Sequence, residues 1–204
     1  MRRCAIIGLR NRGLAILREV LACPELTVAA LCDRDEARLR EAARLAPAAR
    51  LEADAQAVFA DPGIEAVFLI LPNHLHEPLA AAALAAGKQV FLEKPMARSV
   101  AECQRLVAAR DAAGRVLMVG YQQRFCREAE AARAILAGGA LGRITSACAR
   151  WNRRVAIAGL WGRGDWFLDP AQGGGGPLID IGVHKLDLCL DLLGYPAIDR
   201  VVAK

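Results

Sequence analysis

Hydrophobic and polar positions follow two alternating periods along the first 120 residues. Short continuous apolar runs predict buried strands, and segments whose apolar residues recur every three or four positions predict helices. The strands are expected at Cys4–Ile7, Leu26–Cys32, Ala66–Leu71, Val90–Leu92 and Val116–Val119. The helices are expected at Gly13–Leu21, Asp35–Ala46, Ala55–Phe59, Glu77–Ala86 and Ser99–Ala113. Strands that are apolar throughout and alternate with helices indicate a parallel sheet covered on both faces.

Turn and capping residues support these boundaries. Ser99 followed by Glu102 has the pattern of a capping box at the start of a helix. Gly87 and Gly114 stand where glycines commonly end helices. Asp61-Pro62-Gly63 is a turn sequence that leads into the strand beginning at Ala66.

The pattern changes after about residue 122, where elements become longer and less regular. A sheet built on the strands of this part would need partners that the chain scarcely supplies, and an incomplete edge favours aggregation or partner binding. We therefore expect domains at 1–122 and 123–204. The elements expected in the second are a helix at Arg127–Leu136, a strand at Arg143–Arg153, a loop at Val155–Gly176, a helix closed by Gly194 and Pro196, and a strand at Ile198–Ala203.

The helix that follows the glycine run 173–176 is apolar nearly all round, apart from one polar stripe. At about 100° per residue, Asp180, His184, Asp187 and Asp191 fall within an arc of about 60°. A helix this apolar is buried, so the stripe must face either water or a working cleft. Asp180 and His184 are four positions apart and can touch. A carboxylate that orients an imidazole is how proteins build a general base.

Composition limits the classes of function. Of the 204 residues, 55% are hydrophobic and 24% are charged, which permits a real core and argues against disorder. The net charge of +5 suits anionic ligands. The arginines are scattered along amphipathic helices and aromatic residues are few, so nucleic acid is not an expected partner.

The cysteines and histidines indicate a reduced, metal-free protein. The seven cysteines are dispersed and show no C-x-x-C spacing, which is typical of reduced thiols in the cytoplasm. The three histidines have no grouped ligand spacing, so no metal is expected. There is neither a run of about 18 apolar residues nor an apolar leader segment, so we expect a cytoplasmic protein without a membrane partner.

The turn between the first strand and the first helix occupies the position of the dinucleotide fingerprint G-x-G-x-x-G. Gly8 and Gly13 match it, and Arg10 replaces the second glycine, which normally lets the backbone approach the pyrophosphate closely. The amides at the helix N-terminus still point outward, and Arg10 or Arg12 can neutralise phosphate directly. A dinucleotide site is therefore expected here.

Asp33, at the end of the second strand, strengthens this interpretation. It follows Gly13 by 20 residues, where an acid binds the adenosine ribose hydroxyls, and this favours NAD. The adjacent Arg34 can instead accommodate the 2′-phosphate of NADP. The alternative is a generic strand–turn–helix unit in which an Asp caps a helix.

Further chemical groups follow the later strands. The loops at the carboxyl ends of parallel strands line the ligand crevice of an open sheet. Leu71-Pro72-Asn73-His74-Leu75-His76 is one such loop, although its histidines are equally compatible with helix capping. Glu93-Lys94-Pro95 projects an ammonium group towards the same crevice, and 120–125 (Gly-Tyr-Gln-Gln-Arg-Phe) is a third loop. A lone lysine would be an ordinary surface residue, but the loop at 120–125 and the polar-striped helix favour a functional role for Lys94.

Together these segments resemble the glucose–fructose oxidoreductase, inositol dehydrogenase and rhizopine catabolism (Gfo/Idh/MocA) family of NAD(P)-dependent oxidoreductases. The resemblance covers essentially the whole chain in the family's order. It implies an α/β fold class, with a Rossmann doubly wound parallel sheet followed by a partial α+β substrate domain whose open sheet is incomplete. The matching residues are Gly8–Gly13, Pro72-Asn73 with His76, Glu93-Lys94-Pro95, Gly120-Tyr121 with Arg124-Phe125, Gly164-Asp165-Trp166-Phe167, and Gly174-Gly175 through Asp180, His184 and Asp187.

The resemblance implies hydride transfer between a nicotinamide cofactor and a secondary alcohol of a sugar or cyclitol, in a homo-oligomer formed through the C-terminal domain. It makes Lys94 the catalytic lysine, His184 the proton acceptor and Asp180 the partner of His184. The cofactor is expected to be NAD, with NADP as the alternative, bound by Gly8, Arg10, Asn11, Arg12, Gly13, Asp33, Arg34, Leu71, Pro72, Asn73, His76, Glu93, Lys94 and Gln122. Substrate contacts are expected from Lys94, Arg124, Trp166, Asp180 and His184.

Two other functions stay open. Family members continue beyond this length with several more strands, which favours a non-catalytic NAD(P)-binding regulatory module or an inactive fragment of an enzyme. The set of Lys94, Asp180 and His184 argues against that alternative, because a pure binding module has no need of it. A relative with different chemistry on the same site, such as NAD-dependent glycoside cleavage or biliverdin-type reduction, is the second alternative.

Overall fold

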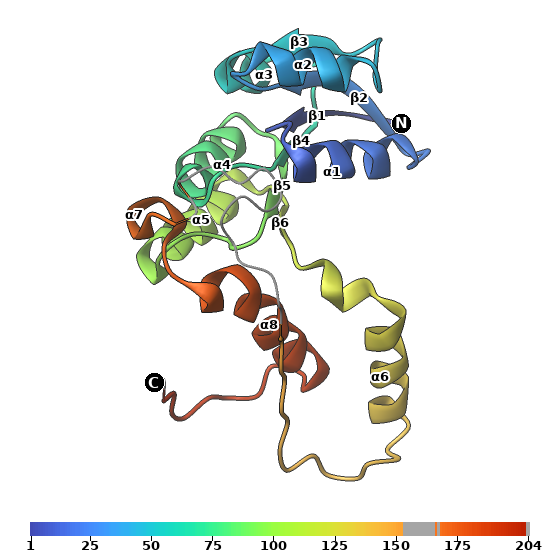
Figure 1. Cartoon of the computed structure of the whole chain (residues 1–204), viewed down its shortest axis with the longest axis vertical. Coiled ribbons are helices and arrows are strands. Elements are labelled where there is room, and N and C mark those ends of the chain that lie inside the picture. Colours follow the sequence, from blue (N-terminus) through green and yellow to red (C-terminus); the bar gives the residue numbers. More distant parts are fainter. Residues whose placement is uncertain (153–165, 167, 203–204) are drawn as a thin grey trace. The chain divides into compact units, whose positions relative to one another are not determined.

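The alternating apolar runs of the N-terminal part fold into a six-stranded, wholly parallel sheet in this computed structural model (Figure 1). The strand order is β3-β2-β1-β4-β5-β6. Successive strands are added on one side of β1 up to β3, and on the other side of β1 from β4 onward. The α/β class expected from the pattern is confirmed. The strands are β1 (Arg2–Ile7), β2 (Leu26–Cys32), β3 (Arg50–Glu52), β4 (Ala66–Leu69), β5 (Gln89–Glu93) and β6 (Leu117–Gly120).

The structure describes residues 1–152, 166 and 168–202, which form two units. The first contains the residues up to Gly120 together with Trp166 and 168–176. The second contains residues 121–152 and 177–202. The division into domains at 1–122 and 123–204 stays a prediction.

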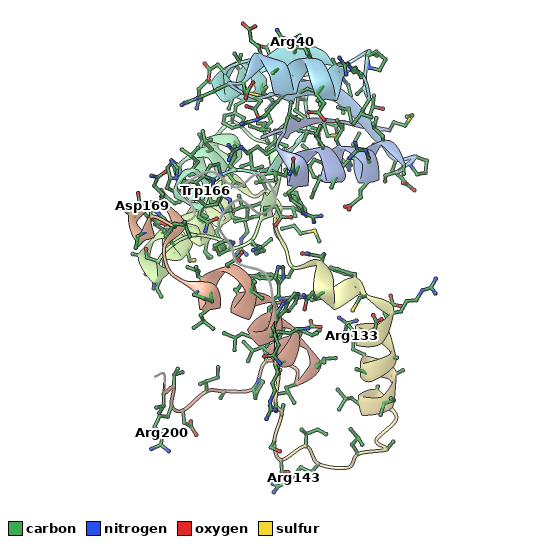
Figure 2. All side chains as sticks on the ribbon, in the orientation of Figure 1. Arg40, Arg133, Arg143, Trp166, Asp169 and Arg200 are labelled. Carbon is green, nitrogen blue, oxygen red and sulfur yellow. The ribbon has the colours of Figure 1, made fainter. Side chains whose placement is uncertain are left out.

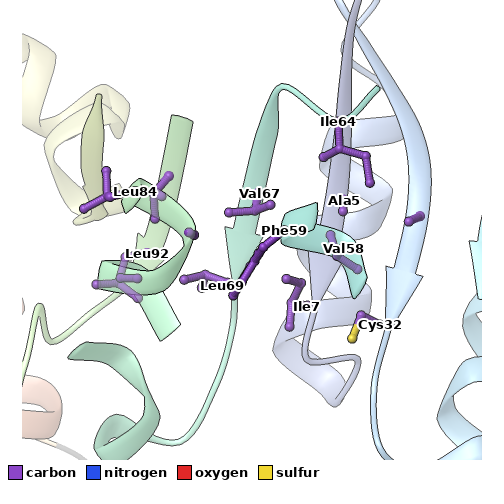
Figure 3. Packing of buried hydrophobic residues seen from close by; sticks show 14 of the residues in the cluster. Ala5, Ile7, Cys32, Val58, Phe59, Ile64, Val67, Leu69, Leu84 and Leu92 are labelled. Atoms are coloured by element: carbon purple, nitrogen blue, oxygen red, sulfur yellow. The ribbon is translucent and has the colours of Figure 1, made fainter. Parts of the chain in front are cut away.

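Helices cover both faces of the sheet because apolar side chains alternate along each strand. Ile6 belongs to one buried cluster and Ile7 to the other (Figure 3 shows the Ile7 cluster). The Ile6 cluster is completed by α1 (Asn11–Leu21) and α2 (Glu36–Ala43). The Ile7 cluster is completed by α3 (Ala55–Ala60), α4 (His76–Ala85) and α5 (Val100–Ala113). Each fully buried Leu or Ile contributes about 1.5–3 kcal/mol, so these two layers hold the first unit together.

The Ser99 N-cap and the terminal glycine expected at α5 are confirmed. Ser99 Oγ accepts a hydrogen bond from the Glu102 amide at 3.2 Å, which satisfies an otherwise orphaned donor of the first turn. Gly114 ends the helix in the left-handed conformation, with φ at +59°. These two residues therefore set both ends of the helix.

Two glycines determine how closely α1 approaches β1. Gly8 has φ at +92°, and a Cβ at this position would lie 2.0 Å from the Ile70 carbonyl oxygen. A Cβ at Gly13 would lie 1.9 Å from the Gly8 carbonyl oxygen. Any side chain at either position would force backbone apart, so the glycines of the turn are required by packing alone.

The second unit is helical in its described part. It contains the 3₁₀ turn η2 (Gln122–Phe125), α6 (Arg127–Ala137), the π-helical turn η5 (Leu178–Gly182) and α8 (Val183–Leu192). The strands expected at Arg143–Arg153 and Ile198–Ala203 are not formed within the described residues, which end at 152 and 202. Ile144, Ile198 and Val201 are exposed, and none of the described residues forms a strand that pairs with these segments.

The described part of the chain contains neither a candidate membrane span nor a candidate metal cluster. No helix there combines the length and apolar character that crossing a bilayer requires. No cluster of three or more His, Cys, Asp or Glu side chains is arranged there to hold a metal ion.

We predict that Gly13→Ala lowers the free energy of unfolding by about 1–3 kcal/mol, because the new methyl overlaps the Gly8 carbonyl. This loss exceeds the gain in helix propensity of about 1 kcal/mol that alanine brings. Gly176→Ala is the matched control, since a Cβ there meets nothing within 4 Å. Urea denaturation followed by circular dichroism measures both, and equal stabilities of the two variants would contradict the prediction.

Candidate functional site

The carboxyl edge of the sheet joins the glycine turn to the acid at the end of β2. The Leu9 amide, inside the turn, donates to Asp33 Oδ2 at 2.8 Å. Asp33 Oδ1 accepts from the Asp35 amide at 2.9 Å, and Arg38 Nη1 lies 3.5 Å away. Asp33 is therefore bonded to the turn that runs from Gly8 to Gly13, the other residues predicted to bind the dinucleotide.

Arg10 adopts an ordinary backbone conformation at the N-cap of α1, with φ at −68° and ψ at 179°. A glycine is thus not needed at this position for the turn itself to form. The first amides of α1, beginning at Asn11, are the orphan donors that attract anions to helix N-termini. Arg34 lies in the loop between β2 and α2.

Arg12 pairs with Glu93 across the sheet edge rather than standing free for a phosphate. Its Nε lies 2.8 Å from Glu93 Oε1, and the glutamate side chain is 8% exposed. Glu93 Oε2 accepts from the Lys94 amide at 3.1 Å. This chain of contacts ties the start of α1 to the end of β5, where the Lys94–Pro95 peptide bond is cis.

His76 is fully buried and both of its ring nitrogens face backbone oxygens. Nδ1 lies 2.6 Å from the Pro95 oxygen and Nε2 lies 2.9 Å from the Leu71 oxygen. Burial lowers the pKa of His76, while the two carbonyl oxygens oppose that shift. The residue therefore joins the loop after β4 to the turn that carries Lys94, and its predicted contact with the cofactor stays a prediction.

Asn73 also bonds within the protein. It lies in the 3₁₀ turn η1 (Asn73–Leu75), and its Nδ2 donates to the Gly173 oxygen at 2.7 Å. Gly173 ends the short helix α7 (Pro170–Gly173), whose first turn Asp169 caps. Figure 2 marks Asp169 and Trp166. Gly164, Asp165 and Phe167, which the family resemblance includes, lie outside the described residues.

Arg98 is the second anchor of this segment. It donates to the Ala171 oxygen, and its guanidinium pairs with Glu102 at 2.6 Å. A Cβ at Gly174 would lie 2.7 Å from the Arg98 Cβ, so the glycine run passes directly over this residue. The segment that precedes the polar-striped helix is thereby attached to the first unit.

In the second unit, Asp180 and His184 are both buried, with 2% and 7% of their surface exposed. Ala129 is the only other buried residue among those described in this unit. Asp180 lies within the π-helical turn and His184 in the first turn of α8, so the helix does not keep uniform α-helical steps. Such turns are rare and are frequent at functional sites.

Two aromatic rings border His184. The Tyr121 ring meets it edge-on, with centroids 6.3 Å apart and planes at 90°. The Trp151 ring stacks against it, with centroids 6.4 Å apart and planes at 25°. Nothing in the spacing of the sequence singled out Trp151, because it lies in an irregular segment distant from His184 along the chain.

The other two residues of the polar stripe, Asp187 and Asp191, face arginines. The sequence predicts instead that the stripe faces either water or a working cleft. Arg124 Nε donates to Asp187 Oδ2 at 2.7 Å, and a second guanidinium nitrogen contacts Oδ1. Arg133 Nη2 lies 2.7 Å from Asp191 Oδ2 (Figure 2 labels Arg133 on α6). Hydrogen bonding to Asp187 raises the pKa of Arg124. These pairs fasten η2 and α6 to α8.

Arg124 is therefore already held on several sides. Besides Asp187, its guanidinium lies over the rings of Tyr121 and Tyr195, 5.7 and 5.6 Å from their centroids. Its predicted substrate contact stays a prediction. Gln122 is exposed on the same 3₁₀ turn.

The candidate residues thus form two groups. The predicted cofactor residues other than Gln122 belong to the first unit, where they lie in or next to the loops that follow the strands. Lys94, directly after β5, is one of them. Asp180 and His184 form the group of the second unit.

Comparison with known proteins identifies the family. Residues 2–121 match a family model described as "Oxidoreductase family, NAD-binding Rossmann fold". Residues 129–204 match a model of the Gfo/Idh/MocA C-terminal domain. The chain belongs to the Gfo/Idh/MocA oxidoreductase family. The resemblance found in the sequence, the Rossmann fold of its first part and the assignment of NAD as cofactor agree with these matches.

Individual Gfo/Idh/MocA relatives include sugar oxidoreductases. D-glucoside 3-dehydrogenase of Escherichia coli (strain K12) is 34% identical over 88% of this chain and 50% of its own length. The crystal structure of GenD2 from gentamicin A biosynthesis in complex with NAD superposes with a TM-score of 0.80 at 27% identity, over 96% of this chain and 54% of that one.

Aldose–aldose oxidoreductase from Caulobacter crescentus, solved with glycerol, gives a TM-score of 0.77 at 30% identity, over 95% and 58% of the two chains. This chain therefore spans about half the length of the relatives it matches.

We predict that Asp187→Asn loosens the second unit of this family member while leaving the first unchanged. The substitution removes the charge from a pair whose members are 29% and 10% exposed, which is expected to cost about 1–2 kcal/mol locally. Hydrogen exchange read by mass spectrometry should accelerate in α8 and η2, with α1 as the internal reference. Asp199→Asn, an exposed site, is the control; equal protection of α8 in both variants would count against the pair.

A second prediction concerns His76→Leu. The neutral imidazole carries one N–H, so the substitution leaves one of the two buried carbonyl oxygens without its donor and should destabilise the protein by about 2–3 kcal/mol. Because burial lowers the pKa of His76, the unfolded chain binds a proton that the folded protein refuses. Wild-type stability should therefore fall as the pH drops below about 6.5, the ordinary histidine value.

The variant should lose part of that pH dependence, since the titrating group is gone. Urea midpoints between pH 5 and 8 measure the effect. His74→Leu, two residues earlier and only partly buried, should cost much less. A His76→Leu protein with wild-type stability and wild-type pH slope would show that the two carbonyl contacts contribute nothing.

Proposed function

We propose that this protein is an NAD(P)-dependent oxidoreductase that transfers a hydride between the nicotinamide and a secondary alcohol of a sugar or cyclitol. One observation carries the proposal: of the three buried residues described in the second unit, two are an aspartate and a histidine one turn apart. Burying polar groups costs free energy, so their position is better explained by chemistry than by stability.

The residues of the first unit fit a dinucleotide. The close approach at Gly8 and Gly13 brings the amides of α1 to the edge of the sheet, where a pyrophosphate is bound in Rossmann folds. The Asp33 carboxylate accepts two amide hydrogen bonds and keeps lone pairs for ribose hydroxyls. Arg10 supplies a positive charge where a glycine usually stands.

The same residues favour NAD over NADP. A 2′-phosphate would lie against the Asp33 carboxylate, and two like charges at such a distance repel. Arg34 and Arg38 oppose this effect, because Arg38 already lies 3.5 Å from Asp33. We therefore expect NADH to bind more tightly than NADPH while NADPH retains measurable affinity.

The chemistry is divided among three side chains. When bound, the nicotinamide supplies the acceptor for the hydride of the carbinol carbon. His184 takes the hydroxyl proton, and Asp180 orients the imidazole and supports its positive charge. Lys94 stabilises the developing alkoxide with its ammonium group. General base catalysis of this kind is worth about 10²–10⁴-fold in rate.

The same assignment implies a substrate class, an oligomeric state and a cellular compartment. The partner is a small-molecule sugar or polyol, and a homo-oligomer forms through residues 123–204. All seven cysteines are free thiols, which supports a reducing compartment such as the cytoplasm.

Titration with NADH and NADPH, followed by quenching of tryptophan fluorescence, tests the cofactor part. Micromolar binding, tighter for NADH, is expected. Oxidation of methyl glucosides and inositols by NAD⁺ then tests the reaction. Lys94→Ala and Asp180→Asn should each lower kcat by at least about 100-fold, while the exposed Asp199→Asn should not.

Each failure has its own meaning. A folded protein that binds neither dinucleotide overturns the whole proposal. Tight NADH binding without turnover of any polyol overturns the reaction and leaves a dinucleotide-binding regulatory module. Turnover that survives Lys94→Ala overturns the role of Lys94.

A further inference from the structure

The groups around the buried His184 define what a substrate must touch. His184 is 7% exposed, whereas Trp151, whose ring stacks on the imidazole, is 41% exposed. Of the two stacked residues, Trp151 is therefore the one that is open to a bound molecule. A hydroxyl that donates to the imidazole has to come within about 2.6–3.2 Å of a ring nitrogen. The carbon framework behind that hydroxyl is then brought next to Trp151.

The stacking geometry leaves part of the indole clear of the histidine. The centroid distance of 6.4 Å exceeds the distance of about 3.5–4 Å at which rings in full face-to-face contact lie, and the planes are tilted by 25°. The imidazole therefore does not cover the indole closely. An aromatic surface beside a general base is a platform for the apolar side of a bound molecule.

Lys185 holds this platform in place. Its ammonium lies 4.8 Å from the centroid of the Trp151 ring, which is a cation–π contact. Lys185 follows His184 on α8, so one helix turn carries both the base and the group that fixes the indole. Tyr121 also meets His184, edge-on. The position of the indole relative to the base is therefore determined by several contacts.

We infer that Trp151 is a specificity-determining residue that forms the apolar wall of the substrate site and selects six-membered-ring polyols over open-chain ones. The inference rests on the proposed function, because it takes His184 as the base. A pyranoside or cyclitol chair presents a rigid patch of C–H groups that fits flat against an indole. An open-chain polyol with the same hydroxyls has no such face and must lose rotational freedom to create one.

The indole itself is the reporter in the test. Labelling with 5-fluorotryptophan gives one fluorine resonance for each of the three tryptophans, and Trp151→Phe assigns the one that matters. Methyl α-D-glucoside and myo-inositol are titrated into the full chain with and without NADH, and sorbitol serves as the open-chain control. The Trp151 resonance should move saturably with the ring compounds and much less with sorbitol at equal concentration.

Kinetics provide the second measurement. Trp151→Ala should raise KM for ring substrates about tenfold, with a smaller effect on kcat, and should leave KM for sorbitol nearly unchanged. Trp151→Phe should restore most of the loss. Leu141→Ala removes an exposed apolar side chain from the same irregular segment and should change neither parameter.

The outcomes separate this inference from the proposed function. A ring compound whose saturable binding is detected by saturation-transfer NMR without movement of the Trp151 resonance overturns the wall, as does an equal response to sorbitol. Equal losses for ring and open-chain substrates in Trp151→Ala overturn it as well. Absence of NADH binding counts against the proposed function alone, and a ring-selective shift of Trp151 in that case still supports the wall.

Discussion

The contact between Gly13 and the Gly8 carbonyl is the constraint on which the first unit depends. With no room for a Cβ at either residue, α1 begins directly against the end of β1. That placement brings the Leu9 amide onto Asp33 and Arg12 onto Glu93. The loops that follow β1, β2 and β5 are thus linked through one backbone approach.

The second unit is held together by different forces. Its described residues bury one apolar side chain, Ala129, whereas the first unit has two extensive apolar clusters. Ion pairs from Arg124 and Arg133 to α8 join its helices instead. Partly exposed ion pairs contribute modestly to stability. Burial of further apolar surface would stabilise a unit of this kind, and the exposed Ile198 and Val201 are side chains that an apolar partner could cover.

Much of the first unit could be predicted from the sequence because its signals are local. Apolar runs identify five of the six strands, and Ser99 and Gly114 mark the ends of α5. The strand β3 was not predicted, because Arg50–Glu52 is only three residues long, lies at a sheet edge and has no apolar run. The segments at 143–152 and 198–202 have strand-like sequences, but a strand exists only where another strand pairs with it.

The candidate site was predictable as a set of residues, and less so as a set of contacts. Spacing along a helix identified Asp180 with His184. It could not reveal that Arg124 faces Asp187 or that Trp151 stacks on His184, because these pairs are joined only by tertiary packing. Asn73 and His76 illustrate the same limit: their position suggests ligand contact, while their hydrogen bonds go to the backbone of distant segments.

Arg10 shows how such a site tolerates a departure from its pattern. The second glycine of the fingerprint serves ligand approach, whereas Gly8 and Gly13 serve packing, and only these two are sterically required here. Arg10 has an extended backbone conformation that any residue adopts, so the arginine does not strain the turn. Its side chain can hinder only the approach of the ligand. Arg12 is partly neutralised by the buried Glu93, which leaves Arg10 as the less encumbered cation beside the α1 amides. A side chain that hinders close approach can thus offset the loss through its charge.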